Sequence, residues 1–262
     1  MKYYNQTENW PEIKLTTTPL ENNVLKKYTH VFFDLDHTLW DYDTNVRESL
    51  SELFEHYTLD SLGIQTNDHF YNAFIEVNYG LWGLYNTGKI DKVNLRKERF
   101  KRIFEHLGAD GLAVPIDMEE DFMSRTSSKK NLFPYSMEVL AYLQEKYKLH
   151  IITNGFNESQ ALKMTSSGIH PYFGLVITSE TIGYKKPDKR IFEYAMSQLG
   201  ATATECIMIG DSLQSDILGA QSVNMDQVFF NPDDKPCVIM PDGQEVCPSY
   251  TIKCLSELKG LL

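Results

Sequence analysis

The strongest constraint on the fold is a series of short apolar runs that each end in polar residues. Four such runs are present, THVFFDLD at 29–36, KLHIITNG at 148–155, FGLVITSE at 173–180 and ECIMIGDS at 205–212. Each apolar run has the length and the β-rich composition of a strand. Helical patterns lie at 137–143 and at 191–199. Strands that alternate with helices predict a mostly parallel, doubly wound α/β sheet. Because ligands bind beyond the carboxyl ends of such strands, all four polar clusters are expected to face one crevice.

Residues 44–130 differ from the rest, since apolar residues recur there at helical spacing and no strand-like run interrupts them. We expect the fourth helix of this block to begin at Asp117, with Glu120 completing a capping box. The predicted division is an extension at 1–24, a core formed by 25–43 and 131–262, and an all-helical insertion at 44–130 after the first strand. Asp242-Gly243 favours a tight hairpin turn.

Charge and hydropathy exclude several classes of protein. The formal net charge is −11, whereas nucleic-acid binders hold phosphate backbones with clustered Lys and Arg. No uninterrupted apolar stretch is long enough to span a bilayer. The N-terminal residues contain no apolar region typical of a secretory signal. We therefore predict a cytoplasmic protein that binds neither nucleic acid nor membrane.

Asp34 and Asp36 stand two residues apart at the end of the first apolar run. If the strand continues, both carboxylates point into the crevice. Two carboxylates so close repel each other unless a cation or a shared proton intervenes. Mg²⁺ suits such a pair, because it prefers oxygen ligands. Two solvated loop aspartates are the alternative interpretation.

The other three polar clusters support a metal and phosphate site more strongly together than each does alone. Asp211 follows the fourth run and could complete a metal site, with Asp216 orienting it from outside the set of ligands. Taken alone, this segment favours a capped helix start, and both interpretations can hold at once. Thr153-Asn154 offers a hydroxyl and backbone N–H groups to phosphate oxygens, although a plain turn is the alternative. Lys186 can neutralise phosphate and carboxylate charge, and Lys185 is expected to be solvated.

In this order, DLDHT, TNG, KKPD and GDSLQSD resemble the four motifs of the haloacid dehalogenase-like (HAD) superfamily of phosphohydrolases. The resemblance covers about residues 28–230. It implies a Rossmann-like core, with the helical block serving as a C1-type cap over the active site. The stretches LWGLYNTGKID and SETIGYKKPDKRIF look more specifically like the noncanonical pyrimidine 5′-nucleotidase branch. The N-terminal extension and an insertion at 233–249 depart from that pattern.

The resemblance also implies catalytic roles. Asp34 would attack phosphorus and form an aspartyl-phosphate, and Asp36 would protonate the leaving oxygen and then deprotonate the attacking water. Mg²⁺ would bind Asp34, the backbone carbonyl of Asp36, Asp211 and the phosphate. The remaining phosphate oxygens would be held by Thr153, the Asn154 backbone and Lys186, and Lys186 would also counter the charge of Asp34.

Several alternatives remain at this point. A dehalogenase shares the first Asp, but Asp36 and Asp211 argue against it. A phosphomutase stays open, as do phosphoglycolate and sugar phosphates as substrates. A phospho-accepting signalling module is about half as long, and a non-catalytic scaffold would not need every catalytic position intact.

Trp40, Trp82 and Tyr85 could face a base or sugar, although packing is the commoner role of aromatics at helical spacing. The oligomeric state cannot be read from the sequence.

Overall fold

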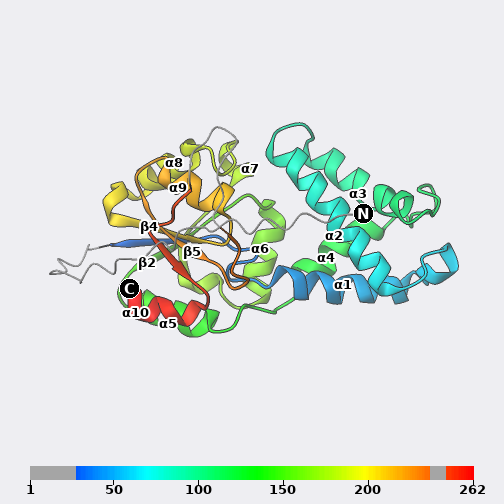
Figure 1. The fold of residues 1–262 in the computed structure, drawn as a ribbon, viewed down its shortest axis with the longest axis horizontal. Coiled ribbons are helices and arrows are strands. Elements are labelled where there is room, and N and C mark those ends of the chain that lie inside the picture. The colour runs from blue at the N-terminus through cyan, green and yellow to red at the C-terminus, as the bar shows by residue number, and fades with distance from the viewer. Residues whose placement is uncertain (1–27, 237–245) are drawn as a thin grey trace, which may run out of the picture.

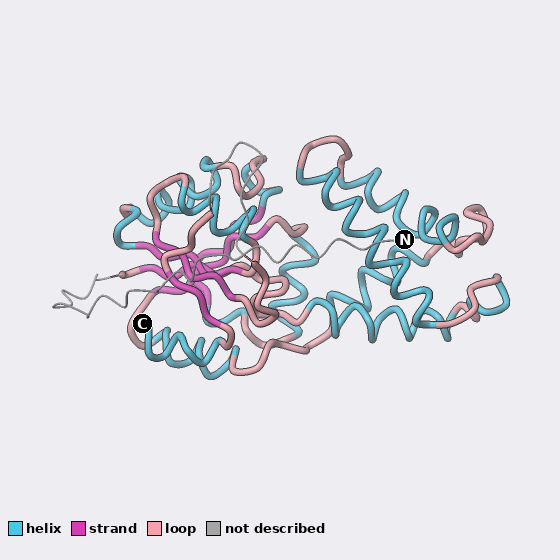
Figure 2. Tube along the Cα trace, viewed as in Figure 1, coloured by secondary structure: helices cyan, strands magenta, loops and turns pink. Residues whose placement is uncertain are grey.

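The computed structural model describes residues 28–236 and 246–262. A six-stranded sheet, in the order β3-β2-β1-β4-β5-β6, forms its centre, and every neighbouring pair of strands is parallel. The strands are β1 His30–Phe33, β2 Lys148–Thr153, β3 Phe173–Thr178, β4 Cys206–Gly210, β5 Asp226–Phe230 and β6 Tyr250–Ile252. Within the described residues all strands gather in one lobe (Figure 2). The predicted doubly wound α/β fold with a helical insertion after its first strand is confirmed.

Helices cover both faces of this sheet (Figure 1). On one face Val31 and Phe33 pack with α5 and α10, and on the other Phe32 packs with α8 and α9. The helices of this lobe are α5 Ser136–Gln144, α6 Asn157–Ser166, α7 Ser179–Ile182, α8 Lys189–Leu199, α9 Leu218–Gln221 and α10 Leu258–Leu261. Neighbouring residues of β1 thus point to opposite faces, and both sides of the strand are buried, which explains its continuous apolar run.

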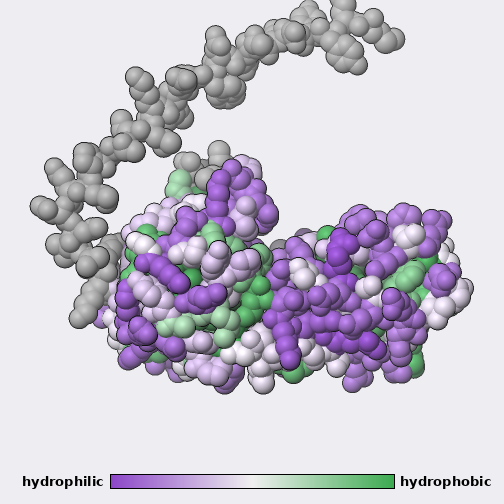
Figure 3. Space-filling model, turned by 90° about the horizontal axis from the view of Figure 1, so that it is seen from below, coloured by the Kyte–Doolittle hydropathy of each residue, from purple (hydrophilic) through white to green (hydrophobic). Residues whose placement is uncertain are grey.

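The segment between β1 and β2 contributes a second, helical lobe (Figure 1). Its helices are α1 Tyr42–His56, α2 Asn67–Asn86, α3 Lys92–His106 and α4 Met118–Ser127, with a short 3₁₀ turn, η1, at Leu59–Leu62. They enclose a core of their own that includes Leu50, Phe70, Phe74, Phe100 and Phe104. On the face drawn in Figure 3 this lobe is largely hydrophilic, as expected for helices whose apolar sides are turned inward.

One expectation about the helical insertion needs correction. Asp117 does precede α4, but its side chain makes no capping hydrogen bond, so the predicted capping box is wrong. The reason is its backbone conformation, φ −93° and ψ 2°, whereas a capping residue usually has extended backbone. Two strands of the sheet, β5 and β6, are not among those predicted from the sequence; β6 contains only three residues.

Some expectations concern residues that are not described. The extension at 1–24 and the turn at Asp242-Gly243 both lie outside the described residues. Among the helices of the described ranges, none is both long and apolar enough to cross a membrane.

Candidate active site

Asp34 is the first residue beyond β1, and its position is fixed by the sheet. Its backbone N–H donates to the carbonyl of Ile209 at 2.9 Å, which extends the pairing with β4 by one residue. The chain then turns at His37, whose φ is 63°, and the N–H of Trp40 returns to the carbonyl of Leu35 at 2.9 Å. This tight loop holds Asp34 and Asp36 at the carboxyl end of β1.

Lys186 faces Asp34 from the segment after β3. Its ammonium group donates to Asp34 Oδ1 at 2.5 Å and to the carbonyl of Ile152 at 2.7 Å, and it lies 2.6 Å from Asp216 Oδ1. Burial opposes the charge of this lysine, but the Asp216 and Asp34 carboxylates outweigh it and raise its pKa. Lys186 is therefore a fixed positive charge beside the Asp34 carboxylate.

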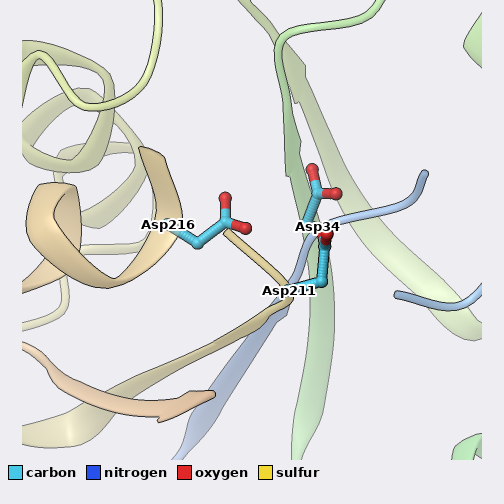
Figure 4. Close-up of side chains that lie close together, drawn as sticks. All are labelled: Asp34, Asp211 and Asp216. Atoms are coloured by element: carbon cyan, nitrogen blue, oxygen red, sulfur yellow. The ribbon is translucent and has the colours of Figure 1, made fainter. Parts of the chain in front are cut away.

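Asp34, Asp211 and Asp216 form an acidic cluster at the carboxyl ends of β1 and β4 (Figure 4). One oxygen atom of each lies within 4.8 Å of the others. Burial raises the pKa of Asp34 to about 7 although Lys186 opposes the shift. Burial and the neighbouring Asp216 and Asp34 raise the pKa of Asp211 well above its usual range. Lys186 alone does not balance these carboxylates, so the cluster has the oxygen donors and the uncompensated negative charge that suit a hard divalent cation.

Asp216 reaches the cluster from a π-helical turn, η4, at Leu213–Ile217. The side chain of Ser212 accepts from the N–H of Ser215 and so caps this turn. Asp216 Oδ2 in turn accepts from the N–H of Ser212 at 3.1 Å. Both interpretations of this segment, as a capped helix start and as part of an acidic site, are therefore correct.

Thr153 and Asn154 lie at the end of β2 and line a cavity together with Asp34 and Lys186. Thr153 Oγ1 accepts from the N–H of Gly155 at 3.1 Å. Asn154 donates to the carbonyl of Lys186 at 3.0 Å and accepts from its N–H at 2.8 Å. Asn154 thereby ties the loop after β2 to the backbone that carries Lys186.

The Asp36 carboxylate is engaged by helix α6. Lys163 Nζ lies 2.6 Å from Asp36 Oδ1, and Gln160 Nε2 donates to Asp36 Oδ2 at 3.0 Å. Sequence reasoning missed both α6 residues. Their spacing of three places them on one helix face, but nothing in the sequence indicates which side chain that face meets.

A cavity of about 290 Å³ extends from these residues to the helical lobe. Trp82 of α2 lines it and stacks on Phe156, with ring centroids 5.1 Å apart. The other two aromatics singled out in the sequence lie elsewhere: Trp40 is fully buried in the core of the sheet lobe, and Tyr85 packs edge-on against Phe156. Trp82 is thus the member of the three that faces the cavity.

The helical side of this cavity also carries polar groups. Among the described residues, Asn78 Oδ1, Arg99 Nε and Thr126 Oγ1 are buried side-chain atoms without a hydrogen-bond partner, and all three residues line the cavity. Arg99 forms an ion pair with Glu119 at 3.3 Å. Buried polar atoms are normally satisfied, so these groups are suited to a polar ligand.

The expectation for Lys185 is wrong. Its ammonium group is half-buried and donates to the backbone carbonyl of Tyr85 at 2.6 Å. It also lies 3.6 Å from the centroid of the Tyr85 ring. The reason is that helix α2 of the insertion ends directly over this loop, which the local sequence does not reveal.

Fold and site define an α/β protein with a helical insertion and an acidic centre. The model of the haloacid dehalogenase-like hydrolase family matches residues 28–224, and the chain belongs to this family. The expected HAD-type enzyme is therefore confirmed.

Three relatives cover most of the chain. The HAD-hydrolase YfnB of Bacillus subtilis is 30% identical over 91% of this chain and 97% of its own length. Its magnesium-bound crystal structure has a TM-score of 0.77 at 29% identity, and the match covers 90% of this chain and 99% of that one. The pyrimidine 5′-nucleotidase YjjG of Escherichia coli is 31% identical over 90% of this chain and 98% of its own. The pyrimidine 5′-nucleotidase PynA of Streptococcus pneumoniae is 30% identical over 90% of this chain and 95% of its own.

Proposed function

We propose that this chain is a Mg²⁺-dependent phosphomonoester hydrolase that acts through an aspartyl-phosphate on Asp34, with pyrimidine (deoxy)nucleoside monophosphates as substrates. The observation that carries the proposal is the buried Asp34 carboxylate, held by Lys186 at 2.5 Å within a cluster of further carboxylates. With it we propose that residues 25–43 and 131–262 are the catalytic core and residues 44–130 the cap.

In the first step an Asp34 carboxylate oxygen forms a bond to phosphorus while the ester P–O bond breaks. Asp36 gives its proton to the leaving oxygen. Lys186 keeps Asp34 in place and contributes positive charge beside the transferring phosphoryl group, whose oxygens it holds together with Thr153 and the backbone of Asn154.

In the second step a water oxygen forms a bond to phosphorus, and the bond between phosphorus and the Asp34 oxygen breaks. Asp36 takes the proton of this water and is restored to its starting state. The catalyst is regenerated, and the products are the free alcohol and inorganic phosphate.

Mg²⁺ would be held by the carboxylates of Asp34 and Asp211 and by the backbone carbonyl of Asp36. When bound, it supplies positive charge that screens the approach of a carboxylate to a phosphate dianion. Asp216 would orient this centre through its contacts with Lys186 and the Ser212 N–H.

Two observations support nucleotides as substrates. Two of the three relatives described above are named as pyrimidine 5′-nucleotidases. The cavity also pairs a stacked aromatic wall, Trp82 on Phe156, with the buried polar atoms of Asn78 and Arg99. A flat ring with polar edges matches such a wall, because it gains from stacking and from hydrogen bonding at once.

The test is a screen of the purified protein against deoxy-UMP, deoxy-TMP, phosphoglycolate and hexose phosphates, with Mg²⁺ and with EDTA. We expect Mg²⁺-dependent release of phosphate, highest with the pyrimidine nucleotides. Asp34→Asn should lower turnover by roughly 10³-fold or more, and Asp36→Asn by about 10²- to 10⁴-fold. The exposed Asp68→Asn serves as the matched control.

Normal turnover by folded Asp34→Asn protein would sink the nucleophile assignment. Broad, weak activity without preference for nucleotides would remove the substrate assignment and leave the hydrolase. Isomerisation of a hexose phosphate without phosphate release would show that the protein is a mutase and not a hydrolase.

A further inference from the structure

We propose that Lys163 and Gln160 of helix α6 are positioning residues that fix the orientation of the Asp36 carboxylate for its two proton transfers. The inference rests on the proposed function, in which Asp36 is the acid and the base. It assigns a task to two residues that none of the four sequence motifs includes.

The contacts are divided between the two oxygens of Asp36. Lys163 Nζ lies 2.6 Å from Oδ1, and Gln160 Nε2 donates to Oδ2 at 3.0 Å. A carboxylate anchored through both oxygens cannot rotate about its terminal bond without losing a hydrogen bond. The Asp36 side chain nevertheless remains 22% exposed and lines the cavity, so the anchored group stays open to a substrate.

The two anchors are themselves held in place. Lys163 is 5% exposed, and its ammonium group lies 4.3 Å from the centroid of the buried Trp40 ring. Gln160 is 1% exposed and fills the space beside Gly155, where an added Cβ would lie 2.0 Å from Gln160 Nε2. Because helix and packing fix both donors, Asp36 is preorganised by a rigid element.

A plain structural ion pair is the competing explanation, because a buried ammonium group needs a partner. The two explanations differ in which reactions suffer when the pair is removed. An alkoxide leaving from a nucleotide needs the proton of Asp36 as the P–O bond breaks, whereas p-nitrophenolate is stable enough to leave without one. A positioning role therefore affects the first reaction and largely spares the second.

The experiment measures kcat/KM, which reports on the steps through phosphorylation of Asp34, with deoxy-UMP and with p-nitrophenyl phosphate. For Lys163→Met we expect a loss of about 10- to 100-fold with deoxy-UMP, within the range of acid–base catalysis, and less than about threefold with p-nitrophenyl phosphate. Gln160→Leu should show the same pattern more weakly, and Lys163→Arg should restore part of the activity. Lys189→Met, at an exposed ion pair on α8, is the matched control.

A double-mutant cycle with Asp36→Asn completes the test. If Lys163 acts through Asp36, adding Lys163→Met to Asp36→Asn costs no further activity, because the two effects are not additive. Equal losses on both substrates, additive losses in the cycle, or a higher KM at unchanged kcat would each overturn the inference while the hydrolase activity of the wild type stands. A wild type that hydrolyses neither compound with Mg²⁺ would overturn the proposed function, and this inference with it.

Discussion

Gly210 illustrates how closely the residues of the candidate site approach one another. A Cβ at this position would lie 2.3 Å from Oδ2 of Asp216. Asp216 is fully buried and contacts both Lys186 at 2.6 Å and the N–H of Ser212 at 3.1 Å. The absent side chain at the end of β4 is what lets the carboxylate reach these partners.

Gly210→Ala is therefore expected to displace Asp216. Overpacking of this kind lowers the free energy of unfolding by about 1–3 kcal/mol, and a shift of about 1 Å at the site can reduce kcat by about 10²-fold. Urea unfolding and phosphatase kinetics measure the two effects. Gly174→Ala is the matched control, since a Cβ there meets only the His150 ring at 3.9 Å. Unchanged stability and activity in Gly210→Ala would contradict this account.

At the residue scale, the sequence predicts site residues that follow a strand better than it predicts the side chains from other elements that contact them. Asp34 and Asp211 come together because they follow β1 and β4, whose carboxyl ends share one edge. Lys186 joins them from the segment beyond α7. The catalytic roles of all three stay a prediction. The contact of Lys163 with Asp36 cannot be predicted in this way, because it depends on how α6 packs against the loop after β1. The contact of Lys185 is not predictable for the same reason, since the carbonyl that it binds belongs to α2.

At the scale of elements, helix α3 of the insertion is joined to the sheet lobe by charged side chains. Lys92 lies 2.8 Å from Glu158 of α6 and 3.0 Å from Glu180 of α7. Arg96 lies 2.6 Å from Glu158. Both cations also face the ring of Phe156, at 4.7 and 5.1 Å from its centroid. These contacts lie beside the stacked wall of the cavity and hold the two lobes together there.

Lys92→Met should therefore weaken the contact between the helical insertion and the sheet lobe. Partly exposed ion pairs contribute about 0.2–1 kcal/mol each, so we expect KM for deoxy-UMP to rise by roughly two- to fivefold. The KM of the wild type should rise with NaCl, because salt screens these pairs, and the variant should respond less. Lys101→Met is the control, as its ion pair with Glu105 lies within α3. Equal salt responses in wild type and Lys92→Met would contradict the role of this contact.

The elements themselves were largely predictable, for physical reasons that differ along the chain. Apolar spacing indicates the helices of the insertion because each turns one face to a shared core. Continuous apolar runs indicate β1, β2 and β4 because both of their faces are buried. Edge strand β6, with two of its three residues exposed, carries no such signal. The cap at Asp117 failed because its backbone does not take the extended conformation.

At the scale of the whole molecule, an acidic chain has to bind an anionic substrate. The formal net charge is −11, and the acidic cluster adds negative charge at the very point where the phosphate would sit. Buried cations such as Lys186 and Arg99 offset part of this charge within the cavity. Asp34, Asp211 and Asp216 lie close together, and burial and the neighbouring Asp216 and Asp34 raise the pKa of Asp211. We therefore expect folding and cation binding to be coupled.

This coupling predicts that Mg²⁺ stabilises the folded protein. A ligand at about 100 times its Kd adds about 2.7 kcal/mol, which corresponds to roughly 5–10 °C in Tm for a chain of this size. Asp211→Asn should lose most of this response, because a neutral amide is a poorer ligand. Without Mg²⁺ the same variant should melt above the wild type, because one buried charge and its repulsion from Asp34 and Asp216 are gone.

Thermal unfolding with MgCl₂, and with NaCl at matched ionic strength, measures both effects without relying on catalysis. Asp68→Asn, at an exposed carboxylate of the insertion, should respond to Mg²⁺ as the wild type does. A full Mg²⁺ response in Asp211→Asn would place the cation elsewhere. A lower Tm of Asp211→Asn without Mg²⁺ would mean that hydrogen bonding to this carboxylate outweighs the repulsion, and that the cluster is stable without a metal. A higher Tm together with lost activity would show that this site trades stability of the folded chain for the ability to bind its cation.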